Sequence, residues 1–394
     1  MKYWRGYLTA AIFGAMTWVL MQMGQKYSDI VDMVYPYVTR SVQGFLTAWT
    51  SGFDFNVWQV AVVVFAVAAL AALVVTIVFK RSIIQWFGWV AAAVSLAILL
   101  NTGVYGLNYY AGPIEEDLRL DMTDYTQTEL ESAAEFYRDR ANSLAVMMPR
   151  DEQGVATFSE FESLAKQTGN GYRHLVLDRS FSIFGGDYTP VKKLGWADLY
   201  TSMGITGFTC FLTGEAAVNP RIPAQSLPFT MAHEMAHRLC VAHEDAANFA
   251  AFLACEANES VEYQYSGYFM AYRYCYSALS SVDSAAARRI SDGCVNELKW
   301  DLDAYDQFFA DNQKEDATRL GNTVNDTYLK ASGDDKGIAS YGAVCDYLVN
   351  WYLSEYAAPE ELEIKFDPYD ESQVDLSGLA NARPAEPAET EPAA

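Results

Sequence analysis

His233-Glu234-Met235-Ala236-His237 is the stretch from which the rest of this chain is best interpreted, because two imidazoles stand four residues apart with a carboxylate beside the first. Residues at positions i and i+4 share one face of a helix, so both rings can reach a single Zn²⁺. Glu234 then faces the water that such a metal holds. The chain has only four histidines in 394 residues, so a chance HExxH is rare. The motif therefore predicts a zinc site.

The third zinc ligand is expected shortly after the motif, because a catalytic zinc has three protein ligands and an open fourth position. His243 stands six residues after His237, which is the metzincin spacing, whereas Glu244 opens an alanine-rich run that is typical of a helix. In gluzincins the third ligand is a Glu at the start of such a helix. Asn248 shares the helix face of Glu244 and can orient a ligand histidine. We expect Glu244 to bind the metal, with His243 as the alternative.

The segment between the two expected helices must contain a turn. If the first helix continued unbroken, Glu244 would lie about 10.5 Å beyond His237 along the axis, too far for the same metal. We therefore expect the chain to turn within residues 239–242. Metzincins have Gly three residues after the second His, where this chain has Cys240. We expect Cys240 to be a buried thiol and not a ligand.

Several segments occur in an order that is typical of one family. They are residues 213–219, 227–230, the HEMAH core, 244–248 and 265–268. In this order they resemble an uncharacterised bacterial membrane-protein family, the domain of unknown function 3810, over nearly the whole chain. The resemblance implies a gluzincin-like zinc peptidase and supplies no substrate, because the family has no settled activity. The family usually has Gly in place of Cys240 and a basic residue in place of His243, and Cys adopts a positive φ only at a cost.

Three apolar runs near the start of the chain predict membrane spans. Residues 60–79 and 83–107 carry no charge, and each run is long enough to cross a bilayer core of about 30 Å. Residues 6–23 form a weaker candidate that also resembles a signal peptide, but no small-residue cleavage site follows it. We expect residues 1–110 to form a three-helix transmembrane region with the lipid bilayer as its partner.

Basic residues indicate the orientation of these spans. Lys2 and Arg5 precede the first run, and Lys80 and Arg81 lie between the second and third, so the positive-inside rule places both pairs in the cytoplasm. Three spans then predict a multi-pass protein of the cell membrane whose HExxH region is extracytoplasmic. A two-span alternative would leave residues 6–23 out of the bilayer and reverse the location of the HExxH region.

Beyond the spans we expect one α+β domain, mostly helical and zincin-like, over residues 111–366, a size that a single core supports. The predicted helices are 128–148, 284–299, 300–311 and 341–356, and the predicted strands are 172–177 and 208–212, with 217–219 as a continuation. Residues 367–394 are acidic and rich in Pro and Ala, which predicts a disordered tail.

The segment just ahead of the motif is the candidate for holding substrate. In zincins an edge strand in this position pairs with extended peptide through main-chain hydrogen bonds. Gly214, Glu215 and Asn219 are therefore the candidate substrate-binding residues, although a plain turn punctuated by Gly214 and Pro220 fits the sequence equally well. We expect Ser226 to cap the metal helix.

The charge of the chain excludes some partners. Its formal net charge of −23 resides mostly after the third apolar run, which argues against nucleic acid and against docking on anionic lipid. The six cysteines include no CxxC pair, so the sequence predicts neither a zinc knuckle nor a redox motif. An exported domain permits disulfides, but their pairing stays open.

The expected ligands predict a zinc metallopeptidase that acts on a peptide or protein substrate. The zinc lowers the pKa of its water toward about 7, and Glu234 takes the water proton and passes it to the leaving amine. Tyr265 and Tyr268 are candidate donors to the oxyanion. Two alternatives stay open: a zinc hydrolase of a non-peptide substrate, and a non-catalytic envelope sensor that is stabilised by zinc and does not need Glu234.

Overall fold

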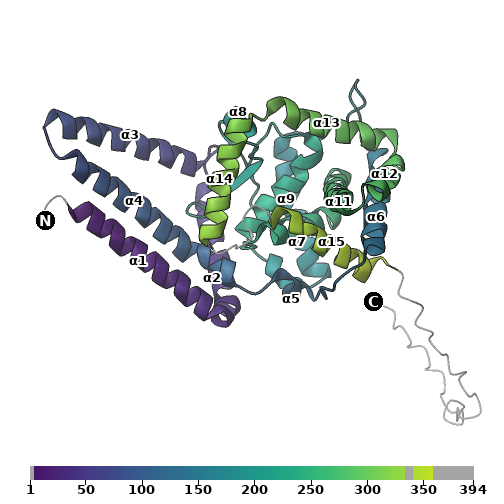
Figure 1. Cartoon of the computed structure of the whole chain (residues 1–394), viewed down its shortest axis with the longest axis horizontal. Coiled ribbons are helices and arrows are strands. Elements are labelled where there is room, and N and C mark those ends of the chain that lie inside the picture. The colour runs from purple at the N-terminus through teal and green to yellow at the C-terminus, as the bar shows by residue number, and fades with distance from the viewer. Residues whose placement is uncertain (1–3, 333–339, 358–394) are drawn as a thin grey trace, which may run out of the picture. The chain divides into compact units, whose positions relative to one another are not determined.

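The structure, a computed structural model, describes residues 4–332 and 340–357. Helices dominate it, as the sequence predicts, and one small sheet lies beside the HExxH helix (Figure 1). The elements before the sheet are α1 (Arg5–Lys26), α2 (Ser28–Thr50), α3 (Val57–Val78), α4 (Ile83–Val104), η2 (Gly106–Tyr110), α5 (Ile114–Leu118), α6 (Gln127–Ala145), α7 (Phe161–Asp178) and η3 (Ser182–Phe184). The sheet region contains β1 (Lys192–Lys193), α8 (Ala197–Ser202), β2 (Gly207–Cys210) and β3 (Glu215–Val218).

The remaining elements build the helical domain. They are η4 (Ala224–Ser226), α9 (Leu227–Arg238), α10 (Glu244–Glu256), α11 (Val261–Val282), α12 (Ser284–Asp292), α13 (Asn296–Asn312), α14 (Glu315–Ser332) and α15 (Ser340–Glu355). The helix predicted over residues 284–299 is divided between α12 and α13, which the short segment from Gly293 to Val295 separates. The predicted tail over 367–394 lies outside the described residues.

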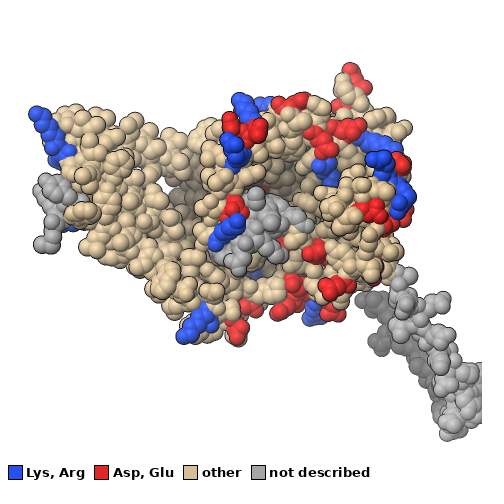
Figure 2. Space-filling model, viewed as in Figure 1, with Lys and Arg blue, Asp and Glu red and all other residues tan. Residues whose placement is uncertain are grey.

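Three helices in the described part of the chain, α1, α3 and α4, are long and apolar enough to cross a membrane. They correspond to the three predicted runs, although α4 ends at Val104 and the chain continues into η2. Figure 2 shows that charged side chains gather over the helical domain, while the flanks of these helices are almost free of charge between their ends. An uncharged flank suits a hydrocarbon environment, where a charged side chain is costly.

Glycines set the direction in which α1 and α4 pack. A methyl group at Gly6 would lie 2.4 Å from the carbonyl carbon of Gly88, so the two backbones almost touch near the start of both helices. At the other end, a methyl group at Gly24 would meet the side chains of Leu107 and Tyr110 at 3.0 and 2.8 Å. The two helices therefore run parallel over their whole length. Because α4 is a span candidate, this packing favours the three-span topology over the two-span alternative.

A helix that the sequence did not predict, α2, connects α1 to α3. Thr39, Gln43 and Thr47 lie on its buried face and contact the helical domain. Its opposite face is exposed and apolar. The three candidate membrane helices and the helical domain are therefore joined by packing as well as by chain connectivity.

The sheet has the order β1-β3-β2, with β1 parallel and β2 antiparallel to β3. The strand predicted over 208–212 is present as β2, and the predicted continuation is the separate strand β3. β3 has a neighbour on both sides, so the expectation that residues 214–219 form an edge strand is wrong. The strand predicted over 172–177 is also wrong, because those residues lie inside α7. There α7 presses against α10, and a methyl group at Gly171 would collide with the Ala254 carbonyl.

The HExxH helix α9 lies in the centre of the domain, and each of its twelve residues is buried. The Tyr172 hydroxyl of α7 donates to the Ala232 carbonyl at 2.8 Å, and Ser266 of α11 accepts from the Phe229 amide at 3.0 Å. Ser226 was expected to cap α9, but its hydroxyl donates to the Pro223 carbonyl instead. Neighbouring helices thus fix α9 on several sides, which holds its side chains in place.

Candidate metal centre

The two motif histidines meet at one point on α9. Their Nε2 atoms lie 3.1 Å apart, and the Glu244 Oε2 lies 3.3 Å from the Nε2 of His233 and 3.5 Å from that of His237. Ligand atoms of all three residues lie within 4.8 Å of one another. The three side chains are 7% to 9% exposed. The helical spacing thus produces a compact, buried group of two imidazoles and one carboxylate.

The turn that brings Glu244 back to the histidines is centred on Cys240. This residue has a φ of +73°, the left-handed conformation that glycine adopts without cost. The amides of Cys240 and Val241 donate to the carbonyls of His237 and Ala236, at 2.9 and 3.0 Å, which closes the end of α9. Glu244 is then the first residue of α10. The sharp turn within residues 239–242 is present as the sequence predicts.

His243, the alternative third ligand, faces away from this group. Its Nε2 lies 3.3 Å from the Tyr109 carbonyl oxygen, and its ring packs edge-on against the Tyr109 ring at 5.4 Å. The backbone of His243 precedes α10, so its side chain leaves the turn on the side of η2. The structure therefore brings Glu244 to the two motif histidines and leaves His243 outside the group.

Neighbouring charges and burial shift the pKa values of Glu244 and His237 in opposite directions. Burial alone raises the pKa of Glu244, but His237 and His233 outweigh it and hold the pKa of Glu244 well below its usual range. Burial likewise tends to lower the pKa of His237, while the Glu244 carboxylate raises it to about 9. The carboxylate therefore stabilises the positive form of the His237 imidazole, and the imidazoles stabilise the negative form of the carboxylate. Because the buried Glu244 carboxylate stabilises a positive charge beside it, this group of residues suits the binding of a cation.

The donor atoms of the group also fit a metal. The Glu244 Oε2 is close to both imidazoles, yet it accepts no well-aligned hydrogen bond from any described residue. The His237 Nδ1 lies 2.9 Å from the Val241 carbonyl oxygen, and an Nδ1–H donated there leaves the Nε2 lone pair directed at the group. Such a backbone partner is what fixes the tautomer of a metal-binding histidine.

Asn248 lies one turn beyond Glu244 on α10. Its Oδ1 accepts a 3.4 Å hydrogen bond from the hydroxyl of Tyr274, and its Nδ2 has no partner among the described residues. The His233 Nδ1 is buried and lacks a described partner as well. The expected role of Asn248 in orienting a ligand histidine stays a prediction, and Tyr274 is an additional polar neighbour.

Glu234 lies beside the group under strand β2. Its Oε2 accepts a 2.7 Å hydrogen bond from the hydroxyl of Thr209, and a methyl group at Gly207 would lie 2.3 Å from its Oε1. A side chain at position 207 would displace the Glu234 carboxylate from this position. Burial raises the pKa of Glu234, although His233 and the Thr209 hydrogen bond lower it in part. A carboxylate with a raised pKa accepts protons more readily, which suits a general base.

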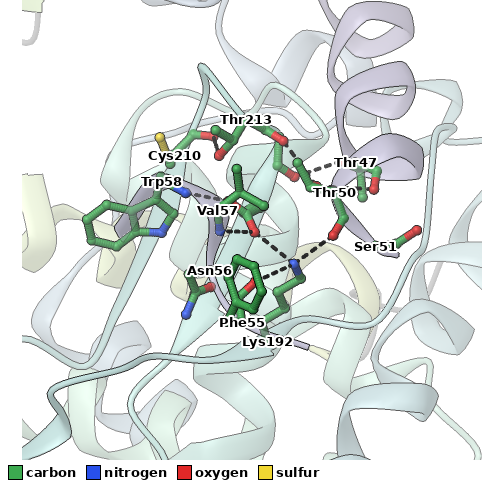
Figure 3. A network of polar contacts seen from close by, with 12 residues as sticks. Thr47, Thr50, Ser51, Phe55, Asn56, Val57, Trp58, Lys192, Cys210 and Thr213 are labelled. Carbon is green, nitrogen blue, oxygen red and sulfur yellow. Dashed lines mark hydrogen bonds and ion pairs between the residues drawn. The ribbon is translucent and has the colours of Figure 1, made fainter. Parts of the chain in front are cut away.

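The residues expected to bind substrate have structural roles instead. Glu215 is buried, and its carboxylate accepts hydrogen bonds from the amides of Val57 and Trp58, at 2.9 and 3.0 Å, and pairs with Lys192 at 2.7 Å. Figure 3 shows Val57, Trp58 and Lys192 in this network of polar contacts. Glu215 thus holds the first turn of α3 against the sheet. The anion is well placed there, at the positive end of a helix dipole.

Gly214 and Asn219 are also occupied by the fold. Gly214 has a φ of +68°, and its carbonyl accepts a 2.6 Å hydrogen bond from Thr47 of α2. Asn219 is fully buried and donates to Thr201 at 2.8 Å and to the Ile205 carbonyl at 3.2 Å. The Gly214 carbonyl and the Asn219 side chain therefore already have hydrogen-bond partners within the protein.

The two tyrosines expected at the oxyanion lie in other hydrogen-bond networks. The hydroxyl of Tyr265 bonds to the buried Asp301, and that of Tyr268 donates to Glu256 at 2.7 Å. The assignment of Tyr265 and Tyr268 as oxyanion donors is therefore not supported by their contacts. Tyr274 lies closer to the candidate site, since its hydroxyl contacts Asn248. Burial is the main cause that raises the pKa of Tyr274, Tyr305 raises it further, and the Glu244 charge makes the smallest contribution.

Sequence reasoning missed Thr209, Gly207 and Tyr274. Thr209 and Gly207 lie in the predicted strand over 208–212 or next to it, and a strand just ahead of HExxH was the available signal. Tyr274 is one of 26 tyrosines, and nothing local distinguishes it. Its place near the site depends on how α11 packs against α10.

Comparison with known proteins identifies a family without naming an activity. The model of a family described as "Protein of unknown function (DUF3810)" matches residues 31–349. No curated protein and no solved structure matches the chain. The match extends from α2 to α15, so it includes α3, α4 and both helices of the candidate metal centre.

Proposed function

This chain belongs to the DUF3810 family, and we propose from its own residues that it is a membrane-anchored zinc metallopeptidase with a gluzincin-like ligand set. One observation carries the proposal: His233, His237 and Glu244 form one buried group, and Glu234 lies next to it on the same helix. Two imidazoles and a carboxylate are a ligand set of catalytic zinc sites. The proposal deepens the family assignment, because the family description states no activity.

In the proposed reaction each residue has one task. A zinc ion held by the three ligands would polarise the scissile carbonyl and acidify a water molecule. Glu234 takes the proton of that water and later delivers it to the leaving amine. Thr209 holds the Glu234 carboxylate by its 2.7 Å hydrogen bond, and Gly207 leaves space for it. The Val241 carbonyl holds the ring of His237.

The sheet supports an extended peptide as the substrate. Strand β2 is paired with β3 on one side only within the described sheet, and it contacts Glu234 through Thr209. An extended peptide can add to such an edge through main-chain hydrogen bonds, which places the scissile bond beside the carboxylate. The role expected for residues 214–219 thus passes to β2, Gly207–Cys210.

The location of the site follows from the spans. We infer that α1, α3 and α4 anchor the protein in the cell membrane and that the domain is extracytoplasmic, as the basic residues Lys80 and Arg81 favour. Because α1 and α4 pack in parallel, we infer that both helices end on the same side of the bilayer. The helical domain follows α4 and lies on that side.

Metal analysis combined with a peptide-library cleavage assay tests the function. We expect the purified full-length protein and its Glu234→Gln variant to hold about one zinc each, while only the native protein cleaves peptides. Equal cleavage by both would refute the role of Glu234. A zinc-loaded native protein that cleaves no peptide would point instead to a zinc-stabilised binding protein or to a hydrolase of another substrate.

A further inference from the structure

The helix α2 is amphipathic, but its polar face is buried and its apolar face is exposed, which is the reverse of a surface helix in a soluble protein. Its buried face carries mostly polar residues, whereas its exposed face is apolar. The exposed apolar residues of α2 are Ile30 (60%), Met33 (71%), Val34 (49%), Tyr37 (56%), Val38 (53%), Phe45 (74%) and Trp49 (61%). Helices at the surface of soluble domains normally bury the apolar stripe and expose the polar one. The reversal indicates that the exposed face of α2 does not face water.

The polar face of α2 is bound to the helical domain. The Arg40 guanidinium donates to the carbonyls of Ser182 and Ile183, at 3.0 and 2.6 Å, and Gln43 donates to the Phe211 carbonyl at 3.0 Å. Asp32 accepts a 2.8 Å hydrogen bond from the Gly112 amide. Asp32 and Arg40 therefore have partners in the protein. The remaining charged residue of α2, Asp29, lies in its first turn, and the helix carries no charge from Ser41 to Thr50.

The connectivity of the spans determines where α2 lies. Only Tyr27 separates α1 from α2, and α2 leads to α3 through residues 51–56. If α1 and α3 both cross the bilayer, the end of α1 and the start of α3 lie on the same side, and α2 lies between them. A helix of 23 residues is about 35 Å long, so it bridges these two points while staying on that side.

We propose that α2 lies along the membrane surface, with the apolar face defined above buried in the lipid and the polar face carrying the helical domain. The proposal rests on α1 and α3 being membrane spans and does not depend on zinc or on peptidase activity. Apolar burial holds the helix in the lipid, because the exposed face has no basic residue to attract anionic headgroups. Tyr37 and Trp49 suit this depth, since aromatic rings concentrate at membrane interfaces.

Lipid is the occupant that the structure favours over a second copy or a soluble partner. Tyr27 connects one end of α2 to α1 and residues 51–56 connect the other end to α3, and both of these helices are apolar enough to cross a membrane. The apolar face of α2 therefore extends the surface that α1 and α3 would present to lipid. In Figure 1 those helices leave the domain at the place where α2 lies. If lipid did not cover this face, its seven apolar side chains would be exposed to water beside the bilayer.

Fluorescence quenching by lipid tests the proposal on the full-length protein in phosphatidylcholine vesicles. Met33→Cys and Phe45→Cys, at the two most exposed positions, are each labelled with an environment-sensitive dye, and part of the lipid carries a nitroxide at acyl carbon 5. We expect blue-shifted emission and at least about half of the quenching seen for Val67→Cys, an exposed position in the middle of α3. The unsubstituted protein, taken through the same labelling, corrects for its native cysteines.

Val282→Cys is the matched control in the domain. Val282 is exposed and apolar, and it precedes α12, which Figure 1 shows on the side of the domain away from α1, α3 and α4. Quenching at positions 33 and 45 that is no stronger than at 282, with water-like emission, would overturn the proposal. Blue-shifted emission without quenching, which disappears in nanodiscs that hold one copy, would assign the face to a second copy and would overturn it as well.

Discussion

Thr209 and Glu234 connect the sheet to the metal helix through a single side-chain hydrogen bond of 2.7 Å, with the same hydroxyl 3.0 Å from the Glu234 carbonyl oxygen. The strand that we propose as the substrate edge is therefore attached directly to the proposed general base. A displacement of β2 would change the position of the carboxylate.

We expect Thr209→Val to keep its zinc and to lower peptide cleavage by about tenfold, because a buried carboxylate loses the donor that holds it. Thr209→Ser retains the hydroxyl and is the control, with cleavage close to native. Zinc content and kcat/KM are measured on all three proteins. If the Val variant cleaved like the native protein, the hydrogen bond would have no part in catalysis.

The ligand set predicts different effects for neighbouring substitutions. Glu244→Ala should reduce zinc affinity by more than the roughly 10- to 100-fold that the loss of a ligand-orienting residue costs, and Asn248→Ala should fall within that range. His243→Ala should retain most of the affinity, because its ring contacts Tyr109 and not the group. Titration against a competing chelator measures the three variants on one scale. The opposite ranking of Glu244 and His243 would establish a metzincin-like site.

Backbone strain at Cys240 makes its substitution informative. Cys240 has a φ of +73°, and a β-branched residue is poorly accommodated in this left-handed region. Cys240→Val should therefore lower the stability of the protein by more than about 2 kcal/mol. Cys240→Gly relieves this strain but loses the 3.3 Å contact from Thr39, so its stability should stay within about 1 kcal/mol of native. Thermal unfolding in detergent compares the two. A Val variant as stable as the Gly variant would contradict the conformation of the turn.

Glu215 should matter for stability and not for substrate binding. Glu215→Ala leaves Lys192 and the amides of Val57 and Trp58 without their carboxylate partner, which should cost about 3–5 kcal/mol. Glu215→Gln keeps an acceptor and should leave KM unchanged wherever the variant is folded. Chemical unfolding and peptide kinetics separate these effects. A large rise in KM with native stability would restore Glu215 to the substrate site.

The topology predicts which residues are accessible from outside the cell. A protease added to intact cells should cleave the protein after residue 107, because the basic residues at 80 and 81 hold the short loop before α4 in the cytoplasm. A cytoplasmic marker protein in the same cells controls for lysis. Protection of the domain until the cells are broken would reverse the orientation without changing the number of spans.

The parts that the sequence predicts well depend on local spacing. The HExxH spacing and the turn before Glu244 are consequences of helix geometry, and the three apolar runs are visible from length alone. α2 was missed because its uncharged runs are interrupted by Asp32, Pro36 and Arg40, so it does not have the pattern of a span. Its apolar face also points away from the protein core, whereas amphipathic patterns are usually interpreted with the apolar face toward the core.

Long-range packing decided the features that sequence could not predict. The segment over 172–177 follows Gly169 and Gly171, which are typical of a turn before a strand, but both glycines allow close approach of neighbouring segments to α7. The same limitation applies to β3, whose central place requires β1 to pair in parallel on its other side. The spacing of apolar residues within α7 or β3 does not reveal which distant segments pack against them.

The contact between Gly6 and Gly88 determines an order of assembly. α1 leaves the ribosome first, yet the surface on which it packs belongs to α4, which begins only at Ile83 and ends at Val104. α2 waits longer still, because the carbonyls that receive Arg40 and Gln43 lie at residues 182, 183 and 211. The amino-terminal part of this protein therefore reaches its final packing only after the segments that hold these partners have been synthesised.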